Sequence, residues 1–158
     1  MAIERDGFPL PDVDDPIVAP FFAAARHREL HVTGCDRCER LVWYPTGPCP
    51  TCGSALTWRA VSGDASLFSW VVVRRPFLPA FAEMVPFITA LVSLREDPAV
   101  RLCTLVPDVD PAELRADQTM VVEFRPLRFP TVPDREVIVP MFIPNRSGSN
   151  STVQGSAL

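Results

Sequence analysis

The sequence contains no lysine, and all 15 of its basic residues are arginines. It therefore has no side-chain amine for a Schiff base and no lysine general base. Histidine is almost as scarce, since His27 and His31 are the only two. A serine or cysteine nucleophile would have to take its base from that pair, and no catalytic constellation is visible in the chain.

Long apolar runs and an excess of positive charge are also missing. No run approaches the roughly 18 residues of a membrane span, and residues 1–6 lack the basic and apolar regions of a secretory signal. The net charge of −4 and the pI near 5.1 oppose a basic nucleic-acid-binding face. Five cysteines, four of them in a metal-binding spacing, suit a reducing compartment. We expect a cytoplasmic protein without a membrane segment.

The most specific motif consists of four cysteines. Cys35 and Cys38 form one Cys-x-x-Cys knuckle, and Cys49 and Cys52 form a second after ten residues. Four thiolates at this spacing can converge on one tetrahedral ion, for which zinc is well suited. A thioredoxin-like redox pair would instead need a single knuckle at a helix start. Four sulfurs leave no open position for water, so we expect a structural Zn²⁺ that folds this small segment.

A helix is expected before the knuckles and short strands around them. Asp15 and Pro16 provide a cap and a first-turn proline, and apolar residues at 17, 18, 21, 22 and 25 share one helical face that continues to about Glu29. Pro20 either begins a second helix or kinks the first. Strands over 30–34, 39–45 and 56–61 give the order of a zinc ribbon.

The second half of the chain predicts a small barrel. Five strands are expected over 65–75, 86–94, 100–106, 119–124 and 136–142, with a short helix near Asp110 between the third and fourth. This is the order of an OB-fold barrel, the alternative being an open β-sandwich of the same strands. The predicted fold is mainly β, with an N-terminal helix and zinc ribbon followed by a five-stranded OB-fold barrel. Its segments are an arm over 1–14, helix plus ribbon over 15–61, the OB-fold domain over 62–144 and a flexible polar tail over 145–158.

The loop over residues 74–87 is the most suggestive feature apart from the cysteines. It places two arginines beside apolar residues, and the arginine side chain binds phosphate through its planar fork. It is either a loop that closes one end of the barrel or a contact surface for a partner or a phosphorylated small molecule. The candidate contact residues are Arg74, Arg75, Pro76, Phe77, Phe81, Pro86 and Phe87.

Two other functional interpretations are weaker. A stacking face for single-stranded nucleic acid would use Phe68, Trp70, Phe87 and Phe124, but part of this set must fill the barrel and the net charge opposes it. Cys103 lies in the middle of a predicted strand, where we expect a small buried side chain and not a nucleophile.

Several stretches taken together resemble the DUF35 family. They are the helix at Phe21–Arg26, the knuckles with Trp43-Tyr-Pro between them, the strand Trp70–Pro76 and the strand Val85–Leu94. The likeness covers roughly residues 15–142. It implies a rubredoxin-like zinc ribbon joined to an OB-fold and associated with acyl-CoA.

The resemblance implies a non-catalytic subunit. DUF35 proteins accompany thiolase-fold enzymes, including sterol-carrier-protein-x-like thiolases and steroid side-chain aldolases. It thus implies a thiolase-like or lipid-transfer-protein-like catalytic partner in a heterotetramer of two plus two, with acyl-CoA at or near the interface. The expected partner reaction is retro-aldol cleavage in steroid or other side-chain degradation. An acyltransferase or condensing thiolase complex is the alternative, and a free-standing OB-fold binder of single-stranded nucleic acid is the alternative from another class. No catalytic residue is carried over from the family. The resemblance carries over the four cysteines as metal ligands and Arg74, Arg75, Pro76, Pro86 and Phe87 as candidate contacts.

Overall fold

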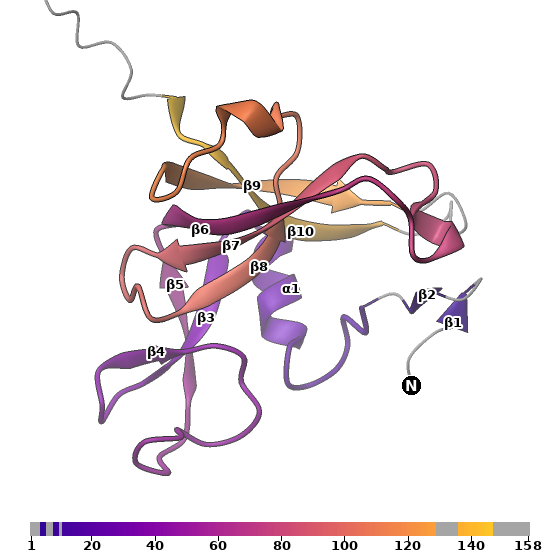
Figure 1. The fold of residues 1–158 in the computed structure, drawn as a ribbon. Coiled ribbons are helices and arrows are strands. Elements are labelled where there is room, and N and C mark those ends of the chain that lie inside the picture. The colour runs from indigo at the N-terminus through magenta and orange to yellow at the C-terminus, as the bar shows by residue number, and fades with distance from the viewer. Residues whose placement is uncertain (1–3, 6–7, 10, 129–135, 147–158) are drawn as a thin grey trace, which may run out of the picture.

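The computed structural model describes residues 4–5, 8–9, 11–128 and 136–146 (Figure 1). The described chain is mainly β, with one α-helix, a zinc ribbon and a nearly closed five-stranded barrel, as predicted. Strands β1 (Glu4–Arg5) and β2 (Phe8–Pro9) form a small antiparallel pair. Most of the predicted polar tail lies outside the described residues.

The α-helix begins later than the sequence suggested. Helix α1 spans Ala19–Arg26, with Val18 at its N-cap and a proline in its first turn. Asp15 still acts as a cap, since its Oδ1 accepts a hydrogen bond from the Ile17 amide at 2.8 Å, but it caps a separate turn. Proline has no amide hydrogen, so Pro20 could not make the backbone hydrogen bond that a helix begun at Pro16 would require there. In the first turn of a helix that bond is not made by any residue, which is why Pro20 fits near the start of α1.

Three strands form the ribbon sheet. They are β3 (Leu30–Cys35), β4 (Arg40–Val42) and β5 (Thr57–Val61), in the order β4-β3-β5. The central strand β3 leads into the first knuckle, and β4 leaves it. Figure 1 shows the ribbon loops extending away from the barrel at the lower left.

The second half folds as one five-stranded antiparallel sheet, which excludes the sandwich. Its order is β10-β9-β6-β7-β8, and a 3₁₀ turn η2 (Pro111–Glu113) lies between the third and fourth of these strands along the chain. Asp110 caps that turn by accepting a hydrogen bond from the Ala112 amide at 2.9 Å. The strands are β6 (Asp64–Val73), β7 (Phe87–Leu94), β8 (Arg101–Leu105), β9 (Thr119–Leu127) and β10 (Val137–Pro144), and the 3₁₀ turn η1 (Pro79–Phe81) lies in the loop after β6.

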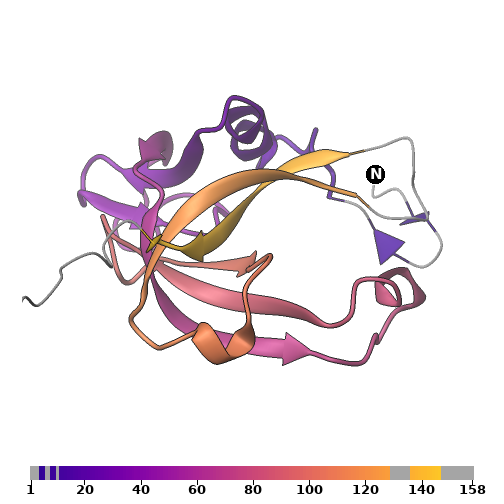
Figure 2. The same ribbon diagram turned by 90° about the horizontal axis from the view of Figure 1, so that it is seen from above.

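The barrel has a seam between its two edge strands, β8 and β10. Full closure would require these strands to pair, and no such pairing occurs among the described strands. Pro140 lies within β10 and has no amide hydrogen to donate, which is why proline in a sheet is confined to edge strands. The view from above shows β9 and β10 arching over β6, β7 and β8 (Figure 2).

Ribbon and barrel share one apolar core. Leu30 and Val32 of β3 are 3% and 0% exposed and belong to the same cluster as the buried barrel residues. Leu67, Val92 and Phe142 are fully buried members of that cluster. The ribbon therefore supports the barrel through side-chain packing as well as through the chain itself.

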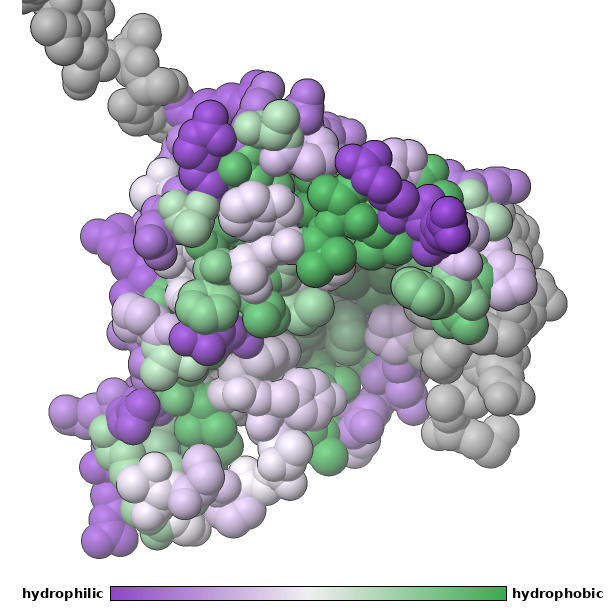
Figure 3. Space-filling model, viewed as in Figure 1, coloured by the Kyte–Doolittle hydropathy of each residue, from purple (hydrophilic) through white to green (hydrophobic). Residues whose placement is uncertain are grey.

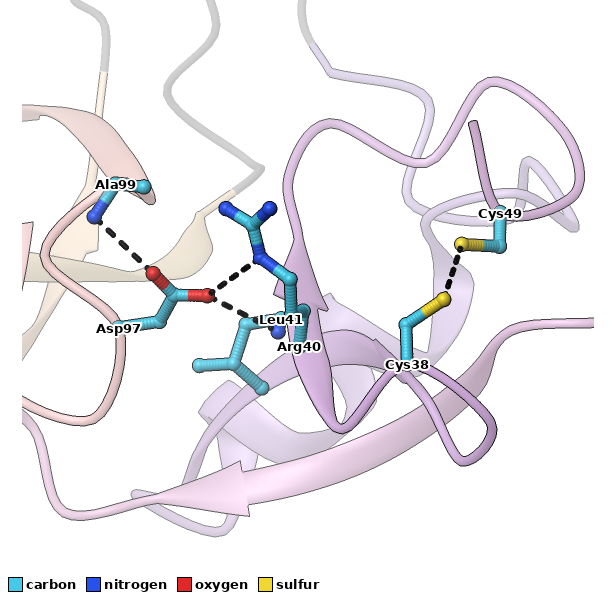
Figure 4. Close-up of polar contacts among 6 residues, drawn as sticks. All are labelled: Cys38, Arg40, Leu41, Cys49, Asp97 and Ala99. Carbon is cyan, nitrogen blue, oxygen red and sulfur yellow. Dashed lines mark hydrogen bonds and ion pairs between the residues drawn. The ribbon is translucent and has the colours of Figure 1, made fainter. Parts of the chain in front are cut away.

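Polar contacts reinforce this junction at the β7–β8 turn (Figure 4). The carboxylate of Asp97 accepts hydrogen bonds from the amide of Leu41 at 3.3 Å and from that of Ala99 at 3.1 Å. Beside it, Glu96 accepts a hydrogen bond from the Ser62 amide at 2.6 Å. Partial burial tends to raise the pKa of Glu96, but the Ser62 amide and hydroxyl outweigh burial and lower it. Both carboxylates thus tie the turn to the ribbon side.

We expect Asp97→Ala to lower the free energy of unfolding by about 1–2 kcal/mol, because two amides lose a charged acceptor at a site that is mostly buried. Urea unfolding would measure the change. Glu136→Ala is a suitable control, since it removes a half-exposed carboxylate whose ion-pair partner among the described residues is Arg128, and it should cost less than about 1 kcal/mol. Equal losses in the two variants would contradict the role assigned to Asp97.

Gly63, in the turn between ribbon and barrel, has a φ of +81°, and a Cβ added there would clash with Cγ1 of Val122. Gly63→Ala should therefore destabilise the fold by roughly 2–4 kcal/mol through backbone strain and overpacking. Gly47→Ala is the matched control, because a Cβ at that position meets no atom within 4 Å. Thermal unfolding of both variants checks this, and a normal melting temperature for Gly63→Ala would contradict it.

Candidate metal centre and apolar cavity

The four knuckle cysteines converge. Their four Sγ atoms all lie within 4.8 Å of one another. Sγ of Cys35 is 3.5 Å from that of Cys52, and Sγ of Cys38 is 3.9 Å from that of Cys49. A tetrahedral ion with Zn–S bonds of about 2.3 Å requires sulfur–sulfur separations of about 3.8 Å. The donor set and its spacing thus fit one zinc ion, as the sequence predicted for a metal site.

The backbone turns of the knuckles prepare the sulfurs for a cation. Hydrogen bonds from the Ser54 hydroxyl and amide lower the pKa of Cys52 to about 6, and the Thr51 and Cys52 amides lower the pKa of Cys49. Hydrogen bonding to Cys52, followed by burial, raises the pKa of Cys38 to about 12. Without a cation the four sulfurs cannot all ionise together, whereas a dication stabilises four thiolates.

Both knuckles turn through a residue of positive φ directly after their second cysteine. Gly53 has a φ of 73° in the second knuckle, where its amide donates to the Cys49 carbonyl at 2.9 Å. Glu39 occupies the corresponding position of the first knuckle with a φ of 53°. The repeated turn gives the two Cys-x-x-Cys segments the same local shape.

The histidines do not form a catalytic pair. His27 is exposed at the end of α1, and the Nε2 atom of His31 lies 3.0 Å from the carboxylate of Glu29. No hydrogen bond joins either ring to a cysteine, serine or threonine within the described residues. Within the described residues, neither histidine is therefore positioned as a base beside the cysteine cluster.

A large apolar cavity lies along the barrel seam. Its volume is about 570 Å³, within the range of pockets that hold drug-sized ligands. Figure 3 shows hydrophobic residues gathered around a hollow on the face of the barrel drawn in Figure 1. The walls come from β7 and the edge strands β8 and β10, from aromatic side chains of α1 and of the residue after β4, and from the loop after β6. The lining residues include Phe21, Phe22, Trp43, Phe77, Phe81, Phe87, Thr89, Leu102–Leu105 and Val139–Phe142.

The structure brings part of the predicted contact set to this cavity. Pro76, Phe77, Phe81 and Phe87 line it, and the rings of Phe81 and Phe87 are stacked with centroids 5.6 Å apart. Phe77 is 94% exposed at its mouth. Pro86 lies instead on an adjoining hollow that contains Arg125 and Arg128.

Arg74 and Arg75 are both exposed and directly precede the cavity-lining Pro76. Neither makes an ion pair with any part of the chain that the structure describes. Arg125, in contrast, forms ion pairs with both Asp108 and Glu123. Hydrogen bonding to Glu123 is the main cause of its raised pKa, and hydrogen bonding to Asp108 is the next.

The expectation that Cys103 is buried was wrong. Its side chain is exposed and lines the cavity, while its strand neighbours Leu102 and Thr104 are buried. The strand alternates as expected, but Cys103 lies on the outward phase, with its Sγ 3.7 Å from the Thr89 hydroxyl.

The aromatic face considered for nucleic acid is not assembled. Trp70 and Phe124 pack against the core, and Phe87 lines the cavity. Phe68 is half exposed, but the Arg101 guanidinium lies 3.7 Å from its ring centroid and covers it. These four side chains therefore do not form one stacking platform.

The sequence interpretation missed most of the cavity walls. Phe21, Phe22 and Trp43 were used only as helix and ribbon residues, yet they reach the cavity, and the rings of Phe21 and Trp43 are 5.1 Å apart. One signal could have indicated the seam, because Pro140 and Pro144 mark the final strand as an edge. None of the described helices is long and apolar enough to span a membrane.

Comparison with known protein families separates the chain into the same two parts. Residues 22–57 match the rubredoxin-like zinc ribbon domain of ChsH2, and residues 58–125 match the C-terminal OB-fold domain of ChsH2. The chain belongs to the DUF35 family. This DUF35 chain therefore joins the two parts in the order that the sequence predicted.

Solved structures agree with this assignment. A chain of the structure described as Ltp2-ChsH2(DUF35) aldolase superposes with a TM-score of 0.70 at 29% identity, covering 85% of this DUF35 chain and 98% of that chain. A DUF35 protein of unknown function from Sulfolobus solfataricus has a TM-score of 0.52 at 13% identity, over 70% of this chain and 80% of its own. The second likeness shows the fold alone.

A curated relative is much longer. The probable enoyl-CoA hydratase alpha subunit of Thermomonospora curvata is 34% identical over 127 residues, and the match covers 78% of this DUF35 chain. The chain spans only 36% of that relative. The DUF35 unit is thus also found as a minor part of a larger protein.

Proposed function

We propose that the protein is a non-catalytic, zinc-binding accessory subunit of a thiolase-fold enzyme that acts on acyl-CoA thioesters. The observation that carries the proposal is the likeness to the Ltp2-ChsH2(DUF35) aldolase chain, which extends over 98% of that chain. The curated relative is named as a probable enoyl-CoA hydratase subunit, which agrees with a role beside CoA thioesters.

The side-chain chemistry supports an accessory role. The cysteine cluster offers four sulfurs to one ion and no open position, and no histidine contacts a nucleophile among the described residues. The partner subunit supplies the catalytic residues, and this chain stabilises the partner and shapes the acyl-CoA site. The zinc holds the ribbon, and through the shared core it also supports the barrel.

The partner surface in this proposal is the loop between β6 and β7. Arg74, Arg75 and Phe77 are exposed there, and a fully exposed phenylalanine costs solvation unless another surface covers it. Among partner reactions we favour retro-aldol cleavage of a β-hydroxyacyl-CoA in side-chain degradation, within a heterotetramer of two plus two.

Co-expression with a thiolase-fold protein encoded beside it tests the proposal. We expect stable co-purification, a mass corresponding to two plus two, and turnover only in the complex. Cleavage without added free CoA would identify a retro-aldolase, whereas a requirement for CoA would identify a thiolase. Turnover by the homogeneous isolated chain, or two proteins that never associate, would overturn the accessory role.

A further inference from the structure

The cavity at the seam has the properties of a ligand pocket within this single chain. Its volume is about 570 Å³, and its walls are carbon-rich, with Thr89, Cys103, Thr104 and the indole of Trp43 as the few side chains that carry a polar group. Water in such a cavity finds few hydrogen-bond partners on the walls. An apolar group that displaces this water therefore binds with a favourable free energy. With so few polar groups, the walls cannot recognise a polar ligand.

The chain segment that borders the cavity carries positive charge. Arg74 and Arg75 lie in the sequence between the lining residues Val73 and Pro76, are exposed, and have no ion-pair partner within the described chain. Elsewhere on the barrel, Arg95 and Arg128 each lie within 3 Å of a carboxylate oxygen. Two unpaired guanidinium groups beside an apolar cavity complement a molecule with a hydrocarbon body and an anionic end.

We propose that this chain alone binds the hydrocarbon body of an anionic amphiphile in the seam cavity, with the anionic end at Arg74 and Arg75. The inference rests on the proposed function only for the identity of the natural ligand, which would then be the acyl chain of the partner's substrate. The cavity itself belongs to this chain, so binding does not require the partner.

The probe is a series of fatty acids of 8, 10 and 12 carbons, titrated by calorimetry into the zinc-loaded full chain below micelle-forming concentrations. Each added pair of methylenes should tighten binding by up to about fifteen-fold while the cavity fills. Tryptophan fluorescence offers a second readout, because Trp43 lines the cavity.

Cys103 locates the bound probe. It is the cysteine outside the metal cluster, is exposed and lines the cavity. The 12-carbon acid should therefore slow its alkylation by a maleimide, followed by mass spectrometry. Binding without protection of Cys103 would place the ligand elsewhere and overturn the proposal.

Matched variants separate the cavity from the arginines. Cys103→Trp should weaken binding at least about ten-fold by filling the cavity, whereas Leu91→Trp, at the cross-strand neighbour that does not line it, should have no effect. Arg75→Ser should weaken binding of the 12-carbon acid by roughly two- to five-fold and leave the uncharged 12-carbon alcohol unaffected. Arg37→Ser, another exposed arginine, is its control.

The result also distinguishes this proposal from the proposed function. If the chain assembles with its partner but binds none of the fatty acids, the accessory role stands and the cavity proposal is wrong. If Cys103 becomes protected only when the partner is added, the seam is a protein-docking surface and the proposal is again wrong. Binding that is independent of chain length would likewise overturn it.

Discussion

Cys49→Ser should yield a protein that retains less than stoichiometric zinc and has lost its cooperative unfolding transition. Structural zinc contributes apparent binding free energies of about 10–16 kcal/mol in small zinc-dependent modules, which equals or exceeds the roughly 5–15 kcal/mol total stability of a domain. Loss of one of the four thiolates should therefore weaken zinc binding by enough free energy to unfold the domain. Metal analysis and circular dichroism during heating would measure both effects.

Cys103→Ser is the control for this experiment. Cys103 lies outside the sulfur cluster and is exposed, so its replacement should leave zinc content and melting temperature unchanged. Strong chelation of the unmodified protein should reproduce the Cys49→Ser result. A soluble, fully folded Cys49→Ser protein without zinc would show that the ribbon does not depend on its metal.

Phe77→Ala should weaken association with the catalytic partner by about 30-fold or more, which corresponds to a truncated interface anchor of about 2 kcal/mol. Because Phe77 is 94% exposed in the isolated chain, the melting temperature should not change. Surface plasmon resonance with the immobilised partner would measure the dissociation constant.

Phe68→Ala provides the matched control for that substitution. Phe68 is also an exposed phenylalanine, but it lies on β6 beneath the Arg101 guanidinium and does not line the cavity. Its replacement should leave partner affinity unchanged. Equal affinity of Phe77→Ala and the unmodified chain would exclude the loop after β6 from the interface.

Local rules predicted most of the fold. The alternation of apolar residues identifies β6 to β10, and the Asp110-Pro111 cap places η2 between β8 and β9. These signals depend on neighbours in the sequence, so most of them can be interpreted without the tertiary fold, although the cap at Asp15 placed the start of α1 too early. The four cysteines are equally local, because two short knuckles need only one hairpin to bring them together.

Features that depend on long-range packing were harder to predict. The phase of β8 was misjudged at Cys103, because alternation shows which residues share a face but not which face is buried. The cavity joins α1, the ribbon and both edge strands, so no single segment carries its pattern. The exposed Phe77 was predicted as a contact residue from its neighbours, but its exposure follows only from the path of the loop.

The shared core has a consequence for how this unit is inherited and engineered. The boundary between the two ChsH2 domain matches falls at residues 57 and 58, inside strand β5, and β3 beside it buries Leu30 and Val32 among barrel residues. A cut at that boundary would expose apolar surface on both halves. Ribbon and barrel should consequently move between proteins only as a pair, and fusions are best attached outside the paired fold. The longer relative from Thermomonospora curvata, whose match covers 78% of this chain, carries more than either part alone.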